Sequence, residues 1–231
     1  TEIYTLSLHD ALPIYARLGQ SVAIYGSIAA AGAPLMDNPG DADSGAVFLF
    51  DLNTTALTAI RITAPTPVAG AHYGAKVGLT GDSLVSVSEI GGLVNMQSYI
   101  GEAKAAINMG AFVSALAVSG RFIAFGMPGS GSVAAGQGFV TVLEARPFGL
   151  GNLPIVHNLT PQLGLVNNER FGTSVALYGD LLASGAPGRF IEDTAGGGAI
   201  GSLITARGLE IPLQYNINAG GLREVVTGGD S

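Results

Sequence analysis

An acidic loop between two apolar runs carries the residues best suited to chemistry. Asp37, Asp41 and Asp43 lie in the stretch DNPGDADSG, shortly after Gly32-Ala33-Pro34. Ca²⁺ takes about six to eight oxygen ligands, often from carboxylates at alternate positions of a tight turn that contains glycine. Asp41 and Asp43 alternate in this way, and Asp37 can reach back over the turn. The sequence therefore predicts a Ca²⁺ site with Asp37, Asp41 and Asp43 as ligands.

The same loop has a second interpretation, which the residues leave open. Pro39 stands where an Asp-x-Asp-x-Asp-Gly loop would place a ligand. Asp, Asn, Pro and Gly also favour turns for local backbone reasons. The loop is therefore equally typical of a solvated acidic turn that holds no metal.

The sequence shows no conventional catalytic set. It contains neither G-x-S-x-G nor H-E-x-x-H. Apart from His9, the histidines are His72 and His157, which have no acid close by in the sequence. The run 129–134 fits G-x-G-x-x-A, but glycines follow it where a dinucleotide site needs a helix. We therefore expect no catalytic residues, no cofactor-binding residues and no enzyme activity.

The elements that must position these residues recur along the chain. Residues 171–187, FGTSVALYGDLLASGAP, alternate with the period of a strand on either side of Gly179-Asp180. Glycine at the first central position of a two-residue loop predicts a type II′ turn. The same offsets recur at 18–34, at 112–128 and, in the first half only, at 73–82. Repetition at this period indicates a propeller, a solenoid or an array.

These residues resemble a known family. Phe171-Gly172 followed by Gly185-Ala186-Pro187 is similar to the FG-GAP repeat, the blade unit of integrin α-chain propellers and of many bacterial surface proteins. The resemblance covers residues 15–206. It is weaker in the third repeat, where Val113 replaces the first glycine, and weakest in the second, where Val87-Ser88-Glu89 replaces Gly-Ala-Pro. FG-GAP repeats often bind Ca²⁺ in the loop after Gly-Ala-Pro, so the resemblance implies the same metal site.

The expected fold is all-β, a partial β-propeller of about four four-stranded FG-GAP-like blades. The fourth strand of the second repeat is expected over 103–109, although 102–107 also suits a short helix. Because the last seven residues resemble 77–83, we expect the chain to be truncated at both ends and its missing repeats to be partners of its end blades. The expected repeats cover 16–70, 71–110, 111–168, 169–218 and the start of a fifth at 219–231.

The first fourteen residues, TEIYTLSLHDALPI, follow none of the repeat pattern. They resemble the translation of a common sequencing-library adapter. We therefore expect residues 1–14 to be an adapter-derived artefact, and we assign no role to His9 or Asp10.

Composition excludes several classes of function. The 231 residues are 12% charged and carry a formal net charge of −7, which argues against nucleic acid as a partner because phosphate binding needs a basic face. Every long apolar run is interrupted by glycine or polar residues, so no transmembrane helix is expected. The absence of cysteine leaves the compartment open.

The resemblance implies a non-catalytic binding or scaffolding module of a secreted or cell-surface protein, stabilised by Ca²⁺. Tyr25, Tyr178 and Phe122 sit beside turn glycines, where they can form a propeller rim that binds a protein or carbohydrate ligand. Packing between blades is the alternative role for these rings. Two other functions stay open: a non-catalytic part of a larger propeller hydrolase whose active site lies in missing sequence, or a fragment without independent function.

Overall fold

The computed structural model describes residues 14–54, 59–130, 135–144, 155–160, 167–179, 181–188, 190–191, 194–195, 198–203, 214–218 and 221–226. Apart from one 3₁₀ turn, η1 (Ile14–Ala16), the described elements are strands. No helix in these ranges is long and apolar enough to cross a membrane. The chain divides into two compact units, residues 1–110 and 111–231, which are described separately.

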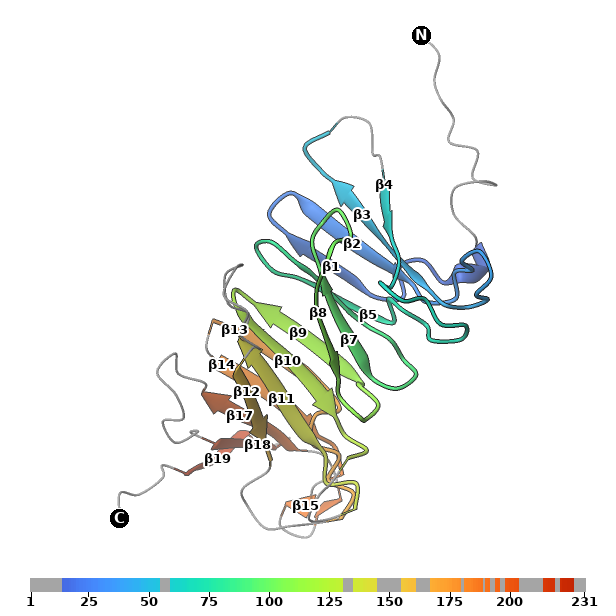
Figure 1. Cartoon of the computed structure of the whole chain (residues 1–231). Coiled ribbons are helices and arrows are strands. Elements are labelled where there is room, and N and C mark those ends of the chain that lie inside the picture. The colour runs from blue at the N-terminus through green and yellow to red at the C-terminus, as the bar shows by residue number, and fades with distance from the viewer. Residues whose placement is uncertain are drawn as a thin grey trace. The chain divides into compact units, whose positions relative to one another are not determined.

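The first unit consists of two four-stranded antiparallel sheets, each with its strands in sequence order (Figure 1). Blade one contains β1 (Val22–Tyr25), β2 (Ile28–Ala33), β3 (Ala46–Asp51) and β4 (Ala59–Ile62). Blade two contains β5 (Lys76–Leu79), β6 (Leu84–Val87), β7 (Leu93–Gln97) and β8 (Ala103–Asn108). Consecutive antiparallel strands in sets of four are the arrangement of a propeller blade, as the sequence predicts.

The short helix considered over 102–107 is wrong. Residues 103–108 form β8, which pairs with β7 from Leu93↔Asn108 to Gln97↔Ala103. Alanine and lysine are good helix formers, but propensity is a weak preference, and pairing with a neighbouring strand overrides it here.

The second unit also contains two main antiparallel sheets (Figure 1). Blade three contains β9 (Ala115–Ser119), β10 (Phe122–Met127), β11 (Phe139–Glu144) and β12 (Ile155–Leu159). Blade four contains β13 (Val175–Tyr178), β14 (Leu181–Ala186), β17 (Gly198–Leu203), β18 (Gln214–Asn218) and β19 (Gly221–Val226). A two-stranded ribbon, β15 (Phe190–Ile191) and β16 (Thr194–Ala195), lies in the connection from β14 to β17.

Residues 221–226, which the sequence assigns to the start of a fifth repeat, pair with β18 as the fifth strand of blade four. The remainder of that assignment, 219–220 and 227–231, lies outside the described residues, as do residues 1–13 of the adapter-like stretch.

Within each unit, the two blades pack face to face through alternate residues of their strands. In the first unit, Val47 and Leu49 of β3 share a core with Val77 and Leu79 of β5. In the second unit, a matching core joins the two blades through Phe122, Ala124, Val140, Val142, Phe171, Leu182 and Ala186. Burying apolar surface at about 25 cal/mol per Å² makes these cores the main stabilising contribution.

The first hairpin of each blade turns at a glycine. Gly26, Gly120 and Gly179 have φ values of 56°, 57° and 58°, which confirms the predicted left-handed position. Asp180, the second turn residue of blade four, lies outside the described residues. Blade two differs, because Gly81 is not left-handed. In this turn the Thr80 hydroxyl accepts the Ser83 N–H at 3.0 Å.

The FG-GAP pattern has a direct structural meaning within each unit. A Cβ on Gly32 would lie 2.0 Å from the carbonyl oxygen of Gly74, and a Cβ on Gly126 would lie 2.0 Å from that of Gly172. Gly74 and Gly172 themselves have φ values of 88° and 89°. The Gly-Ala-Pro glycine of one blade therefore lies against the FG glycine of the next, at a distance that excludes side chains on either residue.

The third repeat shows why Val113 weakens the pattern. Valine at the FG position is absent from the left-handed residues, because a β-branched side chain is strained there. In blade four the Gly172 N–H bonds the Gly185 carbonyl at 3.0 Å, whereas in blade three the Ser114 N–H bonds the Gly126 carbonyl at 2.9 Å. The hairpin still forms in blade three, but the hydrogen bond to the Gly-Ala-Pro glycine is donated one residue later in the repeat than in blade four.

Candidate ligand-binding rim

The predicted metal loop is organised around the side chain of Asn38. Its amide Nδ2 donates to Ser44 Oγ at 2.6 Å and to the Gly45 carbonyl at 2.9 Å. Arg61 from β4 donates to Asn38 Oδ1, and also to the Asp37 carbonyl at 2.8 Å. Asn38 is buried, so its amide satisfies backbone groups that the loop would otherwise leave unpaired.

The three predicted carboxylates do not converge in this loop. Asp37 Oδ1 accepts the Asp43 backbone N–H at 2.8 Å, while Asp41 pairs its own backbone with that of Asn38. Asp37 and Asp43 are exposed and Asp41 is half-buried. Among the described residues, no group of three or more His, Cys, Asp or Glu side chains can hold a metal ion. The Ca²⁺ site therefore stays a prediction from the sequence.

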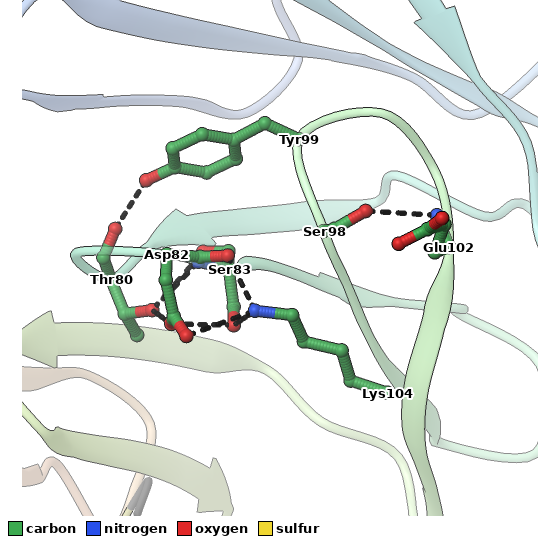
Figure 2. Close-up of polar contacts among 7 residues, drawn as sticks. All are labelled: Thr80, Asp82, Ser83, Ser98, Tyr99, Glu102 and Lys104. Atoms are coloured by element: carbon green, nitrogen blue, oxygen red, sulfur yellow. Dashed lines mark hydrogen bonds and ion pairs between the residues drawn. The ribbon is translucent and has the colours of Figure 1, made fainter. Parts of the chain in front are cut away.

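Polar and aromatic residues gather instead at the turn end of the first unit. A Cβ on Gly81 would lie 3.4 Å from the hydroxyl of Tyr25, which places blade one's first turn beside that of blade two. The Tyr99 hydroxyl donates to the Thr80 carbonyl, as Figure 2 shows. Burial and the nearby charge of Asp82 raise the pKa of Tyr99, so its hydroxyl stays a donor at neutral pH.

We define the turn rim as Tyr25, Asp82, Tyr99, Ile100 and Glu102. Tyr25 is 46% exposed and Ile100 is 73% exposed, and Glu102 is also open to solvent. The Glu102 N–H donates to Ser98 Oγ at 3.0 Å, which closes the β7–β8 turn that carries Tyr99 and Ile100 (Figure 2). The rim thus presents aromatic, aliphatic and acidic groups together.

Lys104 holds the acidic part of this rim in place. Its ammonium lies 2.6 Å from the Asp82 carbonyl, 2.8 Å from Ser83 Oγ and 3.0 Å from Asp82 Oδ2 (Figure 2). Ser83 Oγ in turn donates to Asp82 Oδ1 at 2.8 Å. Burial alone would raise the pKa of Asp82, but hydrogen bonds from Lys104 and Ser83 and the charge of Lys104 outweigh it and lower that pKa. Asp82 is therefore ionised and fixed in direction.

The Ser83–Lys104 pair contains the residue types of a serine–lysine nucleophile, yet its geometry opposes that chemistry. A nucleophilic serine must be accessible and its lysine must be neutral to accept the proton. Ser83 is 3% exposed, and the Lys104 ammonium is paired with the Asp82 carboxylate. The pair instead stabilises the turn between β5 and β6, where Gly81 lacks the left-handed backbone of the other turn glycines.

The other aromatic residues predicted for a rim fall into different environments. Phe122 is buried and lies 5.3 Å below the Arg121 guanidinium, so it packs between blades. Tyr178 of the second unit is 84% exposed. Sequence reasoning found Tyr25 from its neighbouring glycine but missed Asp82 and Tyr99, whose roles depend on contacts between distant strands.

Sequence reasoning also missed the partner of His72. Its Nδ1 lies 3.0 Å from Glu89 Oε2. Glu89 stands where the other repeats have the proline of Gly-Ala-Pro, so the repeat register contained the signal that places it near His72. His157 lies in β12, where its backbone pairs with Val142.

Comparison with sequence families identifies one repeat directly. The FG-GAP repeat model matches residues 14–50, which span β1 to β3 of blade one. None of the curated proteins compared with the chain matches it.

Comparison with solved structures shows the fold. The computationally designed Ika4 protein aligns with 82% of this chain and 92% of its own, at 15% identity and a TM-score of 0.51. A chain of the Mitotic Checkpoint Complex aligns with 83% of this chain at 15% identity and a TM-score of 0.52, and this chain spans about half (47%) of that chain's length. The chain is therefore all-β, with four-stranded antiparallel sheets that resemble propeller blades.

Proposed function

We propose that this chain is a non-catalytic binding or scaffolding module of a secreted or cell-surface protein, which binds a protein or carbohydrate ligand at the turn rim. One observation carries the proposal: exposed Tyr25 and Ile100 lie at the same end of the first unit as the fixed carboxylate of Asp82. The resemblance to FG-GAP repeats supports the compartment, and the predicted Ca²⁺ site is part of the proposal.

The chemistry of the rim suits recognition. Tyrosine supplies a large apolar ring with a polar tip, and such rings are enriched where proteins bind partners. The Tyr99 ring is anchored through its hydroxyl, and the Asp82 carboxylate through Lys104. Groups that are already ordered lose little conformational entropy on binding. The acidic side chains can accept hydrogen bonds from sugar hydroxyls or from the N–H groups of a peptide.

One further observation favours a binding role over a catalytic one, and a second argues against nucleic acid as the ligand. Ser83 and Lys104, the pair closest to a catalytic arrangement beside the rim, are held in a part-buried hydrogen-bond network with Asp82. The net charge of −7 disfavours nucleic acid as a ligand.

The test is binding of the purified full chain to an oligosaccharide array and to an array of extracellular proteins. We expect Tyr25→Ala and Asp82→Asn each to weaken the strongest signals by about tenfold, the effect of losing one good contact. Tyr15→Ala is the matched control, because Tyr15 is more exposed than Tyr25 and lies outside the rim. Signals that do not change in the rim variants, or that fall equally in the control, would contradict the proposal.

The compartment has its own test. An antibody against the chain should stain intact source cells, or detect the chain in their medium, without permeabilisation. Staining that requires permeabilised cells would contradict the surface assignment while leaving the rim intact as a binding site.

A further inference from the structure

The contact between consecutive blades has two parts that both units share and a third part seen in the first unit. The first is the glycine pair, Gly32 against Gly74 and Gly126 against Gly172. The second is a set of apolar residues on strand two of one blade that covers strand one of the next. The third, in the first unit, is Ser21 Oγ, which accepts the Val77 N–H at 2.9 Å. We call the surface of a blade that faces its successor the trailing face, and the opposite surface the leading face.

On the leading face of blade one, the described residues leave the apolar side chains of strand one exposed. Val22 and Ile24 stand at the positions of Val77 and Leu79 in blade two. Val22 is 70% exposed and Ile24 is 67% exposed, against 6% and 4% for Val77 and Leu79. Gly19 has the same left-handed backbone as Gly74, with φ of 87°, yet a Cβ on it would meet no atom within 4 Å.

On the trailing face of blade four, the described residues likewise leave side chains of strand two exposed. Leu181, Ala183 and Gly185 stand at the positions of Ile28, Ala30 and Gly32 in blade one. Leu181 is 46% exposed and Ala183 is also exposed, whereas Ala30 is buried. The nearest atoms to a Cβ on Gly185 belong to Ser174 of the same blade. Ser174 is exposed and stands at the position of Ser21.

These two faces are complementary in each of the three parts. Gly185 matches Gly19 as Gly32 matches Gly74. Leu181 and Ala183 match the exposed pair on β1, and Ser174 Oγ matches the Val22 N–H. Blade two does not offer the same surface, because Val87 occupies the position of Gly32.

We propose that the trailing face of blade four binds the leading face of blade one in a second copy of this chain. The contact repeats the blade-to-blade contact that each unit already contains. It joins two different surfaces, so the assembly is heterologous and grows into a closed ring or an open filament. The partner is recognised by a glycine with no side chain, flanked by small apolar residues and a serine hydroxyl.

The first test is sedimentation of the full chain from about 1 to about 100 µM, the range in which modest interfaces assemble. We expect the mass to rise from one chain to two or more with concentration. Ile24→Glu and Ala183→Glu should each leave a single chain at all concentrations, because each places a charge in the apolar contact. Both side chains are exposed, so circular dichroism should be unchanged.

A mixture of the two variants gives the sharper result. The Ala183→Glu chain keeps its leading face and the Ile24→Glu chain keeps its trailing face, so an equimolar mixture should recover a species of two chains. Ile90→Glu is the control, because Ile90 is exposed and lies outside both faces, and it should assemble like the parent. A parent that stays a single chain, assembly that survives either substitution, or a mixture that fails to pair would overturn the proposal.

Discussion

Replacing Gly126 with alanine tests the glycine contact that joins blades three and four. Gly126 lies within β10 and pairs with Ala115 and Val140, and its φ is outside the left-handed region. Alanine at such a position would normally stabilise a protein by about 0.4–1 kcal/mol, because the unfolded chain loses freedom. Here its Cβ would lie 2.0 Å from the Gly172 oxygen and 2.9 Å from its carbonyl carbon.

Because both atoms belong to backbone, the neighbouring blade has to move. Overpacking a core costs about 1–3 kcal/mol, and a rigid backbone neighbour favours the upper end of that range. Set against the gain in the unfolded state, the expected net loss in free energy of unfolding is about 2 kcal/mol.

The assay is urea unfolding followed by far-ultraviolet circular dichroism. With an m-value of about 2 kcal/mol per M, the Gly126→Ala midpoint should fall by about 1 M. Gly129→Ala is the matched control, since no atom lies within 4 Å of its added Cβ and its φ is also outside the left-handed region. Its midpoint should change by less than about 0.3 M. Equal midpoints for the two variants at an unchanged m-value would refute the reasoning.

Three other perturbations have defined outcomes. Gly19→Ala and Gly172→Ala both strain a left-handed backbone by about 1–2 kcal/mol. Only Gly172 has backbone atoms within 3 Å of the new Cβ, so the urea midpoint of Gly172→Ala should fall further. Equal losses in the two variants would contradict the contact between Gly126 and Gly172. Asp82→Asn should lower the free energy of unfolding at pH 6, and its difference from the parent should shrink below about pH 4. The reason is that a pKa lowered in the folded state stabilises the protein only while the carboxylate is ionised. A stability difference that persists at pH 2 would exclude the Asp82–Lys104 ion pair as the cause of the destabilisation. Ca²⁺ should raise the melting temperature of the parent and not that of Asp41→Ala/Asp43→Ala, and an unchanged parent would show that the sequence prediction of a metal site is wrong.

The strands were predictable from the sequence because the alternation and the glycine offsets are local signals. The alternation over 171–187 corresponds to β13 and β14, and that over 18–34 to β1 and β2. The turn glycines at 26, 120 and 179 have the expected sign of φ. Gly81 does not, and in that turn the Thr80 hydroxyl bonds both the backbone N–H and the carbonyl of Ser83. A propensity assigned to glycine alone does not include such hydrogen bonds.

The candidate site was less accessible from the sequence, because its contacts join residues far apart in the chain. Lys104 reaches Asp82 from a strand 22 residues later, and Arg61 reaches Asn38 across 23 residues. The sequence prediction for the acidic loop relied on the carboxylates of Asp41 and Asp43. The buried side-chain amide of Asn38 determines how the loop folds. The repeat register places residue 89 near residue 72, but it does not indicate that the side chains of Glu89 and His72 form an ion pair.

The most direct test of the binding proposal is recovery of an array ligand after incubation with the chain, with the bound fraction and the ligand's mass measured together. We expect the parent and Tyr15→Ala to retain the ligand with its mass unchanged, and Tyr25→Ala to retain about tenfold less. A ligand that is converted to a new mass by the parent, or that is retained equally by all three proteins, would contradict a non-catalytic rim built on Tyr25 and Asp82.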